Sequence, residues 1–224
     1  MARSCTAQGP RPPAVPRLAL PELGAQDPSG LRRGAYLELT AFDGVDLNRP
    51  DLNRLQLDTC KLAALCVKEI HINGWRATET QLHKVRATSI MAQCSTWVEV
   101  EFLDSRIGAL SMPNSDWRKV RVEGCRVNHL SLSGSTLSDV VLSNCQVDEL
   151  DLTETTARRV SFPNTQIGCL RLRSAHLEDV DLRGATFSEL DNAASLSGAT
   201  ISPEQLPLLA GSLASAIGIR VLKG

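Results

Sequence analysis

Apolar residues recur at every fifth position of this chain, without a break, from Leu37 to Phe187. A period of five fits neither the 3.6 residues of a helical turn nor the two-residue alternation of a flat strand. It requires a chain that turns a corner after each short extended piece, as a solenoid does. The sequence therefore predicts a repetitive all-β architecture over about three quarters of its length.

A second apolar column lies two residues before each of these positions. From Val100 onward it repeats valine, a small residue, leucine and a small residue in every four pentads. This repeat predicts four sides per coil, and so a square cross-section in which both columns point inward. The residue between the columns should point outward, because successive side chains of a strand alternate. About eight coils at roughly 4.8 Å each give a rod on the order of 40 Å long.

Corner residues of two kinds alternate along the repeat. Glycine or asparagine precedes a small inward residue at Asn114, Gly124, Gly134, Asn144, Asn164 and Gly184. These residues tolerate positive φ, which predicts type II-like turns. The intervening corners, such as 118–119 and 138–139, carry ordinary residues and are expected to turn differently. Between Cys60 and Ser95 the second column holds Ile70, Trp75 and Ile90, so we expect a bulge or a bent coil there.

Three pentads carry a resemblance to a known family. They read GATFS at 184–188, GSTLS at 134–138 and SAHLE at 174–178. Each resembles the motif of the pentapeptide repeat family, in which a small residue and a polar residue precede leucine or phenylalanine. The resemblance implies a right-handed quadrilateral parallel β-helix. The chain departs from the motif in placing valine or leucine at half of the small positions, which implies a bulkier core on alternating sides.

The ends of the repeat divide the chain into three parts. Residues 1–34 form a proline-rich, partly disordered segment, with disorder expected up to about Pro16, whereas Leu18, Leu20 and Leu23 are expected to cross the first coil. Residues 35–202 form the β-helix, whose phase slips by one residue after Phe187. Residues 203–224 form a C-terminal capping α-helix and a short strand.

Capping residues predict where the C-terminal helix starts and ends. Ser202, Pro203 and Gln205 supply an N-cap, a first-turn proline and a capping-box partner. The helix should end near Ala216, before Gly218. Its apolar face consists of Leu206, Leu209, Leu213 and Ile217. Covering the last coil is the favoured role, and pairing two rods into a homodimer is the alternative.

Composition excludes several classes of function. The chain has 24 Lys and Arg against 25 Asp and Glu, which argues against a nucleic-acid-binding surface. No apolar run is long enough for a membrane span or a signal peptide, and the seven cysteines include no CxxC pair. We therefore expect a cytoplasmic protein with reduced cysteines. The four histidines have no partners at a metal-ligand spacing, and no catalytic motif is present, so no catalytic residue, metal or cofactor is predicted.

The leading interpretation of function is a non-enzymatic protein-interaction scaffold of unknown partner. The resemblance suggests an alternative, since some family members mimic DNA and protect DNA gyrase from quinolones. Mimicry requires a long surface of one sign, whereas residues 35–194 hold 22 acidic and 17 basic residues. The candidate acidic patch for a partner consists of Asp148, Glu149, Asp151, Glu154, Glu178, Asp179 and Asp181. One corner column alternates in charge and should pair between coils, through Glu99, Lys119, Asp139, Arg159 and Asp179.

Overall fold

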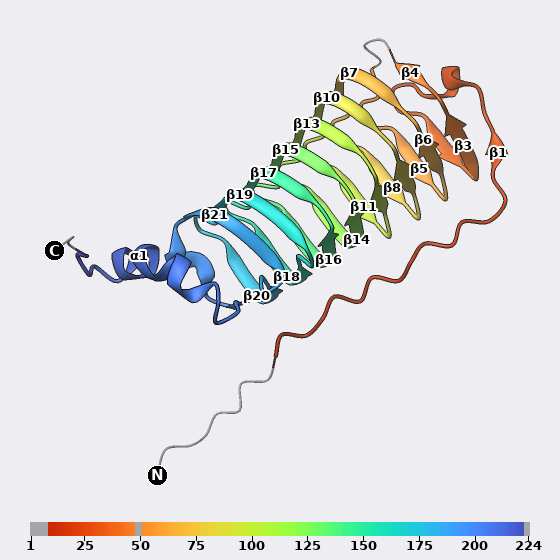
Figure 1. Ribbon diagram of the computed structural model, residues 1–224. Helices are drawn as coiled ribbons and strands as arrows, with labels where there is room; N and C mark the ends of the chain where they lie inside the picture. Colours follow the sequence, from red (N-terminus) through yellow and green to blue (C-terminus); the bar gives the residue numbers. More distant parts are fainter. Residues whose placement is uncertain (1–8, 48–50, 222–224) are drawn as a thin grey trace.

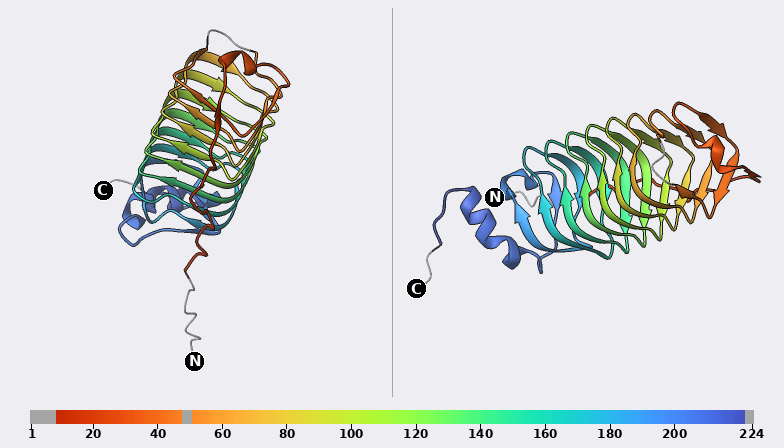
Figure 2. Two further views of the ribbon diagram at one scale, coloured as in Figure 1. Left: turned by 90° about the vertical axis from the view of Figure 1, so that its right-hand side faces the viewer. Right: turned by 90° about the horizontal axis from the view of Figure 1, so that it is seen from above.

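The protein is a parallel β-solenoid of about nine turns with one C-terminal helix, as predicted for the fold class. The computed structural model describes residues 9–47 and 51–221. Coils stack along one axis into a straight rod, the N-terminal segment runs beside the rod, and α1 (Leu206–Ala216) lies at its C-terminal end (Figure 1). Two further views show the regular stacking of the coils (Figure 2).

Two sheets form the walls of the rod. The first contains β1 (Gly24–Ala25), β2 (Tyr36–Glu38), β3 (Thr40–Asp43), β5 (Gln56–Asp58), β6 (Lys61–Ala63), β8 (Arg76–Thr78), β9 (Gln81–His83), β11 (Thr96–Val98), β12 (Glu101–Leu103), β14 (Asp116–Glu123), β16 (Thr136–Ser143), β18 (Thr156–Ser161), β20 (His176–Asp181) and β22 (Ala199–Thr200). The second contains β4 (Asp46–Leu47), β7 (Cys66–His71), β10 (Arg86–Met91), β13 (Arg106–Ser111), β15 (Arg126–Ser131), β17 (Gln146–Asp151), β19 (Thr165–Arg171) and β21 (Ala185–Asp191).

The register between coils is 20 residues, as four pentads per coil require. Trp97 lies opposite Trp117, and Leu130 lies opposite Leu150. The same register holds between Cys60 and Ser95, where Cys66 pairs with Arg86, so the bulge expected there is wrong. The larger inward side chains, Ile70, Trp75 and Ile90, are buried without a bulge. They line an apolar cavity of about 50 Å³.

Both predicted columns fill the core. Val120, Val122 and Leu137 are buried, and successive coils place like side chains above one another. The rings of Trp97 and Trp117 stack with their centroids 5.0 Å apart and their planes 6° apart. The two tryptophans therefore pack on each other inside the rod, and the solenoid core is continuous from coil to coil.

The corners differ from the prediction in one respect. Glycine and asparagine corners have positive φ as expected, for example Gly124 at 67° and Asn144 at 53°. The ordinary residues Lys119 and Asp139 also have positive φ, at 55° and 57°, yet β14 and β16 continue through them. The strand ends at other ordinary corners, such as Glu99 after β11, which has a φ of 55°, so positive φ is common to both kinds of corner.

The C-terminal end is closed by a polar cap and one leucine. After the phase slip, Ala199 pairs with Val180, which confirms that the repeat resumes one residue early. The Gln205 side chain donates to the carbonyl oxygens of Leu182 and Ala185, both at 2.7 Å, and accepts from the Ser202 N–H at 2.8 Å. Leu209 is buried against the last coil. These contacts satisfy backbone groups that an open solenoid end would leave unpaired.

The helix begins later than predicted and ends where it was predicted to end. It begins at Leu206 rather than Pro203, with a turn before it, and ends at Ala216 before Gly218, whose φ is 80°. Leu206 is 52% exposed and Ile217 is 75% exposed, so only part of the predicted apolar face covers the rod. Residues 219–221 are not a strand, and the rest of the short strand predicted there lies outside the described residues.

Candidate functional site

The N-terminal segment lies along the rod instead of crossing only its first coil. Residues 9–23, which we call the strap, run over the first sheet parallel to the rod axis (Figures 1 and 2). The strap then joins β1, which pairs with β3. Disorder up to about Pro16 is therefore a wrong expectation for residues 9–16, because hydrogen bonds fix Arg11 and Ala14 on the rod. The part of this prediction that concerns residues 1–8 lies outside the described residues.

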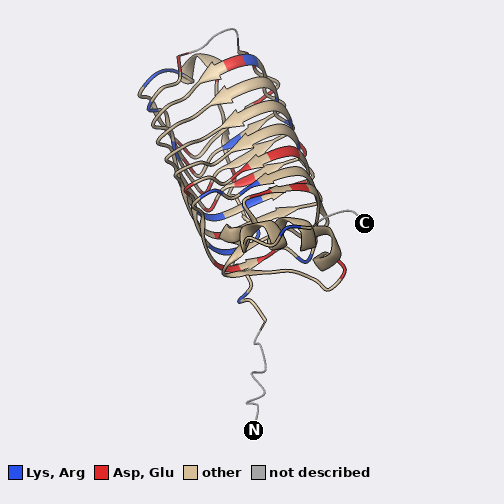
Figure 3. Ribbon diagram, turned by 90° about the vertical axis from the view of Figure 1, so that its left-hand side faces the viewer, with Lys and Arg blue, Asp and Glu red and all other residues tan. Residues whose placement is uncertain are grey.

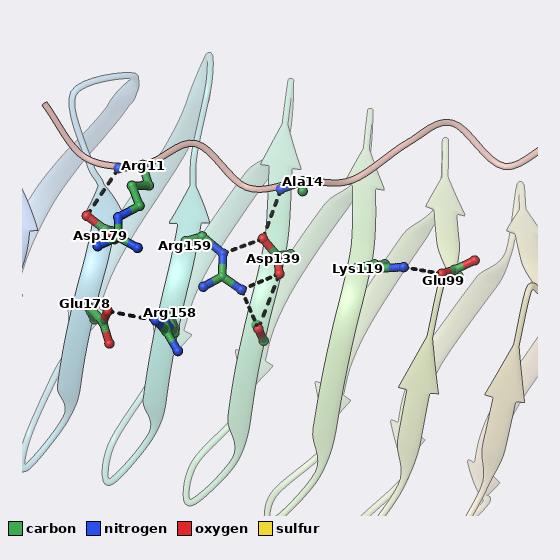
Figure 4. Close-up of polar contacts among 10 residues, drawn as sticks. Arg11, Ala14, Glu99, Lys119, Asp139, Arg158, Arg159, Glu178 and Asp179 are labelled. Carbon is green, nitrogen blue, oxygen red and sulfur yellow. Dashed lines mark hydrogen bonds and ion pairs between the residues drawn. The ribbon is translucent and has the colours of Figure 1, made fainter.

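Main-chain groups of the strap are bound by side chains of the rod. The Arg11 N–H donates to Asp179 Oδ1 at 3.2 Å, and the Ala14 N–H donates to Asp139 Oδ1 at 2.9 Å (Figure 4). Asp139 and Asp179 lie two coils apart on one corner column, in β16 and β20. Their carboxylates thus accept hydrogen bonds from the main chain of an extended peptide at two points.

Two further backbone contacts lie nearer the N-terminal end of the rod. The Leu18 N–H donates to Glu101 Oε1 at 3.0 Å, and the Arg121 guanidinium donates to the carbonyl oxygen of Val15. Glu101 lies between two inward residues and points away from the core, but it is only 4% exposed because the strap covers it. Its other oxygen accepts from the Gln81 amide at 3.1 Å, and Arg121 Nε lies 3.7 Å from Oε1. Burying this charge pair is tolerated because each member has other polar partners.

The strap also contributes two positive charges. Arg11 Nε lies 3.5 Å from Asp179 Oδ2, and Arg17 lies 3.4 Å from Glu123 Oε2. Both arginine side chains remain more than 70% exposed, so these pairs add little free energy and chiefly favour one orientation of the strap. We call Glu101, Arg121, Glu123, Asp139 and Asp179 together the strap face.

The alternating corner column pairs its charges in the way its sequence predicts. Lys119 Nζ lies 2.6 Å from Glu99 Oε1, and Arg159 Nε lies 2.7 Å from Asp139 Oδ1 (Figure 4). Asp179 is the exception, since its partner is Arg11 of the strap. The Arg159 hydrogen bonds, aided by the Ala14 N–H, lower the pKa of Asp139 to about 2. Asp139 is therefore an ionised acceptor throughout the physiological pH range.

Asp139 should make the stability of the protein depend on pH. Its pKa falls from 3.8 in the unfolded chain to about 2 in the folded protein, so its contribution is full above pH 4 and is lost as the pH falls toward 2. We expect the unfolding free energy of the wild type to exceed that of the Asp139→Asn variant by about 2 kcal/mol at pH 6 and by almost nothing at pH 2. Urea denaturation of both proteins between pH 2 and 6 measures this difference. A difference that does not change with pH would contradict the assignment.

The predicted acidic patch is divided between two sheets. Asp148, Glu149 and Asp151 lie in β17 of the second sheet, and Glu154 follows that strand. The other three members, Glu178, Asp179 and Asp181, lie in β20 of the first sheet. Glu149 and Asp179 occupy corners half a coil apart in phase, so the seven carboxylates do not form one surface.

Most of these carboxylates have partners on the rod. Glu149 contacts Arg171 at 2.9 Å and His129 at 3.4 Å. Glu178 contacts Arg158 at 3.2 Å, and Asp181 contacts Arg183 at 2.7 Å. Asp151 accepts from the Thr153 N–H at 2.9 Å. Asp148 and Glu154 are exposed. Figure 3 shows acidic and basic positions interspersed along the coils.

Sequence reasoning did not single out Glu101, Arg121 or Glu123 as site residues. Each is an isolated outward-facing charge in the repeat, which is ordinary for a solvated strand. The strap sequence itself held one signal of an extended bound segment, since its prolines at 12, 13 and 16 are interspersed with residues that keep an N–H. Such a stretch favours the extended polyproline II conformation.

Other chemistry is limited within residues 9–47 and 51–221. No group of three or more His, Cys, Asp or Glu side chains there is arranged to hold a metal ion. Cys125 and Cys145 are buried free thiols one coil apart, and the neighbouring Cys145 sulfur together with burial raises the pKa of Cys125. No helix within these ranges combines the length and apolar character needed to cross a membrane.

Comparison with known proteins identifies only loosely similar structures. No family model and no curated protein matches the chain. Full-length QnrB1, a plasmid-mediated fluoroquinolone resistance protein, is 16% identical, with a TM-score of 0.33, over 84% of this chain and 94% of that chain. HetL, a pentapeptide repeat protein involved in heterocyst differentiation regulation from the cyanobacterium Nostoc sp. strain PCC 7120, is 15% identical, with a TM-score of 0.30, over 77% and 92% of the two chains.

The class of the protein rests on its own repeat rather than on these superpositions. A five-residue period, four sides per coil and a 20-residue register between coils are all present in the chain. These features define a four-sided parallel β-solenoid, which is the fold that the resemblance to the pentapeptide repeat family implies.

Proposed function

We propose that the protein is a non-enzymatic scaffold that binds another protein on a flat side of its rod. The observation that carries this proposal is the strap face, where side chains of the rod hold an extended polypeptide by its main chain. A sheet wall of this kind offers a long, rigid surface and repeats its contacts from coil to coil. The predicted acidic patch supplies further candidate contacts, in one set of carboxylates in and after β17 and a second set in β20.

A DNA-mimicking role at DNA gyrase has less support. The corner column carries ion pairs between coils, Glu99 with Lys119 and Asp139 with Arg159, which cancel much of the field that a mimic needs. We expect micromolar protein neither to inhibit the supercoiling reaction of purified gyrase nor to protect it from a quinolone. Inhibition or protection in that assay would favour the mimic instead.

Affinity capture from the native cell extract tests the scaffold directly. The full chain should enrich a specific partner. A tagged variant with a substitution on the sheet that binds the partner should not enrich it. A matched pair of variants is Asp139→Asn on the first sheet and Asp148→Asn on the second. Failure of the wild-type chain to enrich any protein over a tag-only control would contradict the scaffold proposal.

The proposal includes a homodimer formed through α1. Leu206, Leu208 and Ile217 are exposed on the side of this region that does not cover the rod, and Leu208 is 71% exposed. Pairing two rods at these ends would bury them. Sedimentation velocity tests this part, and a single monomeric species at tens of micromolar would contradict it.

A further inference from the structure

We propose that the strap face is a docking site for a proline-rich, extended segment of a partner protein, and that the strap occupies this site in its absence. This inference rests on the proposed scaffold function and names the chemistry of its partner. It is carried by how the strap is bound, how its geometry matches the coils, and how little of it is buried.

The strap face recognises the main chain rather than side-chain identity. Three carboxylates accept from the N–H groups of Arg11, Ala14 and Leu18, and Arg121 donates to a carbonyl oxygen. Pro12 and Pro13 have no N–H, so no further main-chain donor lies between the bound N–H groups of Arg11 and Ala14. Any chain with the same spacing of prolines and amides presents the same groups.

The spacing of the acceptors matches a polyproline II chain. Such a chain rises about 3.1 Å per residue and completes a turn in three residues, or about 9.3 Å. Two coils of stacked strands span about 9.4 to 9.8 Å. Arg11 and Ala14 are three residues apart, and their acceptors Asp179 and Asp139 are two coils apart, so one turn of the peptide advances by two coils.

Side chains of the rod orient two of the acceptor carboxylates, Asp139 and Glu101. Arg159 binds both oxygens of Asp139, and Gln81 binds Glu101, so both carboxylates are oriented by neighbours that do not belong to the strap. Such preorganisation lowers the entropic cost of binding a peptide. Proline-rich ligands lower it further, because their unbound form is already extended.

The strap is bound in a way that permits exchange. No side chain from Pro10 to Gly30 is buried, although Pro13, Val15 and Leu18 are partly covered. A segment with few buried apolar contacts opens at low free energy. The tether gives the strap a high effective concentration, so a partner segment must bind more tightly than the strap or meet a loosened strap.

Substitution of Ala14 by proline separates the strap from its site without altering the site. Ala14→Pro removes the N–H that Asp139 accepts, keeps the extended conformation and changes no residue of the coils. The probe is a fluorescein-labelled peptide with the sequence of residues 9–24, added to the full-length chain and followed by fluorescence anisotropy. We expect the Ala14→Pro chain to bind the probe about tenfold more tightly than the wild-type chain does, which corresponds to loss of one charge-assisted hydrogen bond in the competing strap.

Two controls identify the contact. A probe that itself carries Ala14→Pro should bind the Ala14→Pro chain about tenfold more weakly, and so should the unmodified probe when the chain also carries Asp139→Asn. Far-UV circular dichroism of each variant verifies that the coils are intact. Equal binding of the probe by the wild-type and Ala14→Pro chains, or equal binding of the two probes, would overturn the inference. Dimerisation of the Ala14→Pro chain through exchanged straps would overturn it too, because the site would then serve a second copy.

Capture from extract distinguishes this inference from the scaffold proposal. A partner that is retained better by the Ala14→Pro chain and lost with Asp139→Asn supports both. A partner retained equally by the wild-type and Asp139→Asn chains overturns the docking site while the scaffold proposal stands. Probe binding as expected, without any partner in the extract, supports the docking site and contradicts the scaffold.

Discussion

Replacing Trp117 by alanine should lower the unfolding free energy by about 3–5 kcal/mol. Its side chain is fully buried at the centre of the rod and stacks on Trp97, with Leu137 in the same column of the next coil. The substitution removes the stacking contact and leaves a cavity that the flanking coils cannot close, because their register is fixed by backbone hydrogen bonds. Guanidinium denaturation followed by far-UV circular dichroism measures the loss.

Trp117→Phe is the matched control. The Trp117 Nε1–H makes no hydrogen bond within the described part of the chain, so phenylalanine keeps most of the packing and removes a buried donor that has no partner. We expect this variant to lose less than about 1.5 kcal/mol. Tyr36→Ala, at a residue that is 56% exposed, should change stability by less than about 0.5 kcal/mol. A Trp117→Ala variant within 1 kcal/mol of the wild type would contradict the packing described for this coil.

Replacing Gly198 by alanine should detach the last turn of the solenoid. Gly198 has a φ of 86°, and a Cβ at this position would lie 1.8 Å from the carbonyl oxygen of Leu177 in the coil below. A left-handed conformation costs a non-glycine residue roughly 1–2 kcal/mol, and overpacking costs a further 1–3 kcal/mol. The backbone must move, which breaks the pairing of β22 with β20 and weakens the contacts of Gln205 and Leu209. Hydrogen exchange of amides in β20 and β22 should therefore quicken.

Gly211→Ala is the matched control for Gly198→Ala. It lies inside α1, where a Cβ would meet nothing within 4 Å, and alanine is the better helix former by about 1 kcal/mol. We expect this variant to be as stable as the wild type or slightly more stable. A Gly198→Ala variant with unchanged exchange rates in β20 would show that the close approach to Leu177 does not constrain the cap.

The repeat could be predicted in detail because the same packing requirement recurs in every coil. A side chain that points inward at Val120 or Leu137 must be apolar in every coil, and a period of five with a repeat of 20 permits only one arrangement of sides. The phase slip before Ala199 could be read for the same reason. The charge ladder was predictable too, since residues 20 apart become neighbours once the register is known.

The expected bulge near Trp75 was wrong because residue size was taken as a limit on register. In the folded protein, the larger side chains are buried and the pairing between strands keeps the 20-residue register. The ordinary corners were described incompletely for a similar reason. At the corner of Glu99, which has a φ of 55°, the backbone N–H donates to the carbonyl oxygen of Arg118 in the next coil, and this contact holds a conformation that the residue does not favour locally.

Taken alone, the sequence determined the square solenoid, its register, its core columns and the position of its C-terminal helix, because these follow from local periodicity repeated many times. Only the tertiary structure decided where the strap lies, which carboxylates are free and that the acidic residues face two different ways. Each of these depends on contacts between segments without a common period, such as Ala14 with Asp139, or Gly198 with Leu177. A single non-repeating contact leaves no pattern in the sequence, and the candidate binding site is built from such contacts.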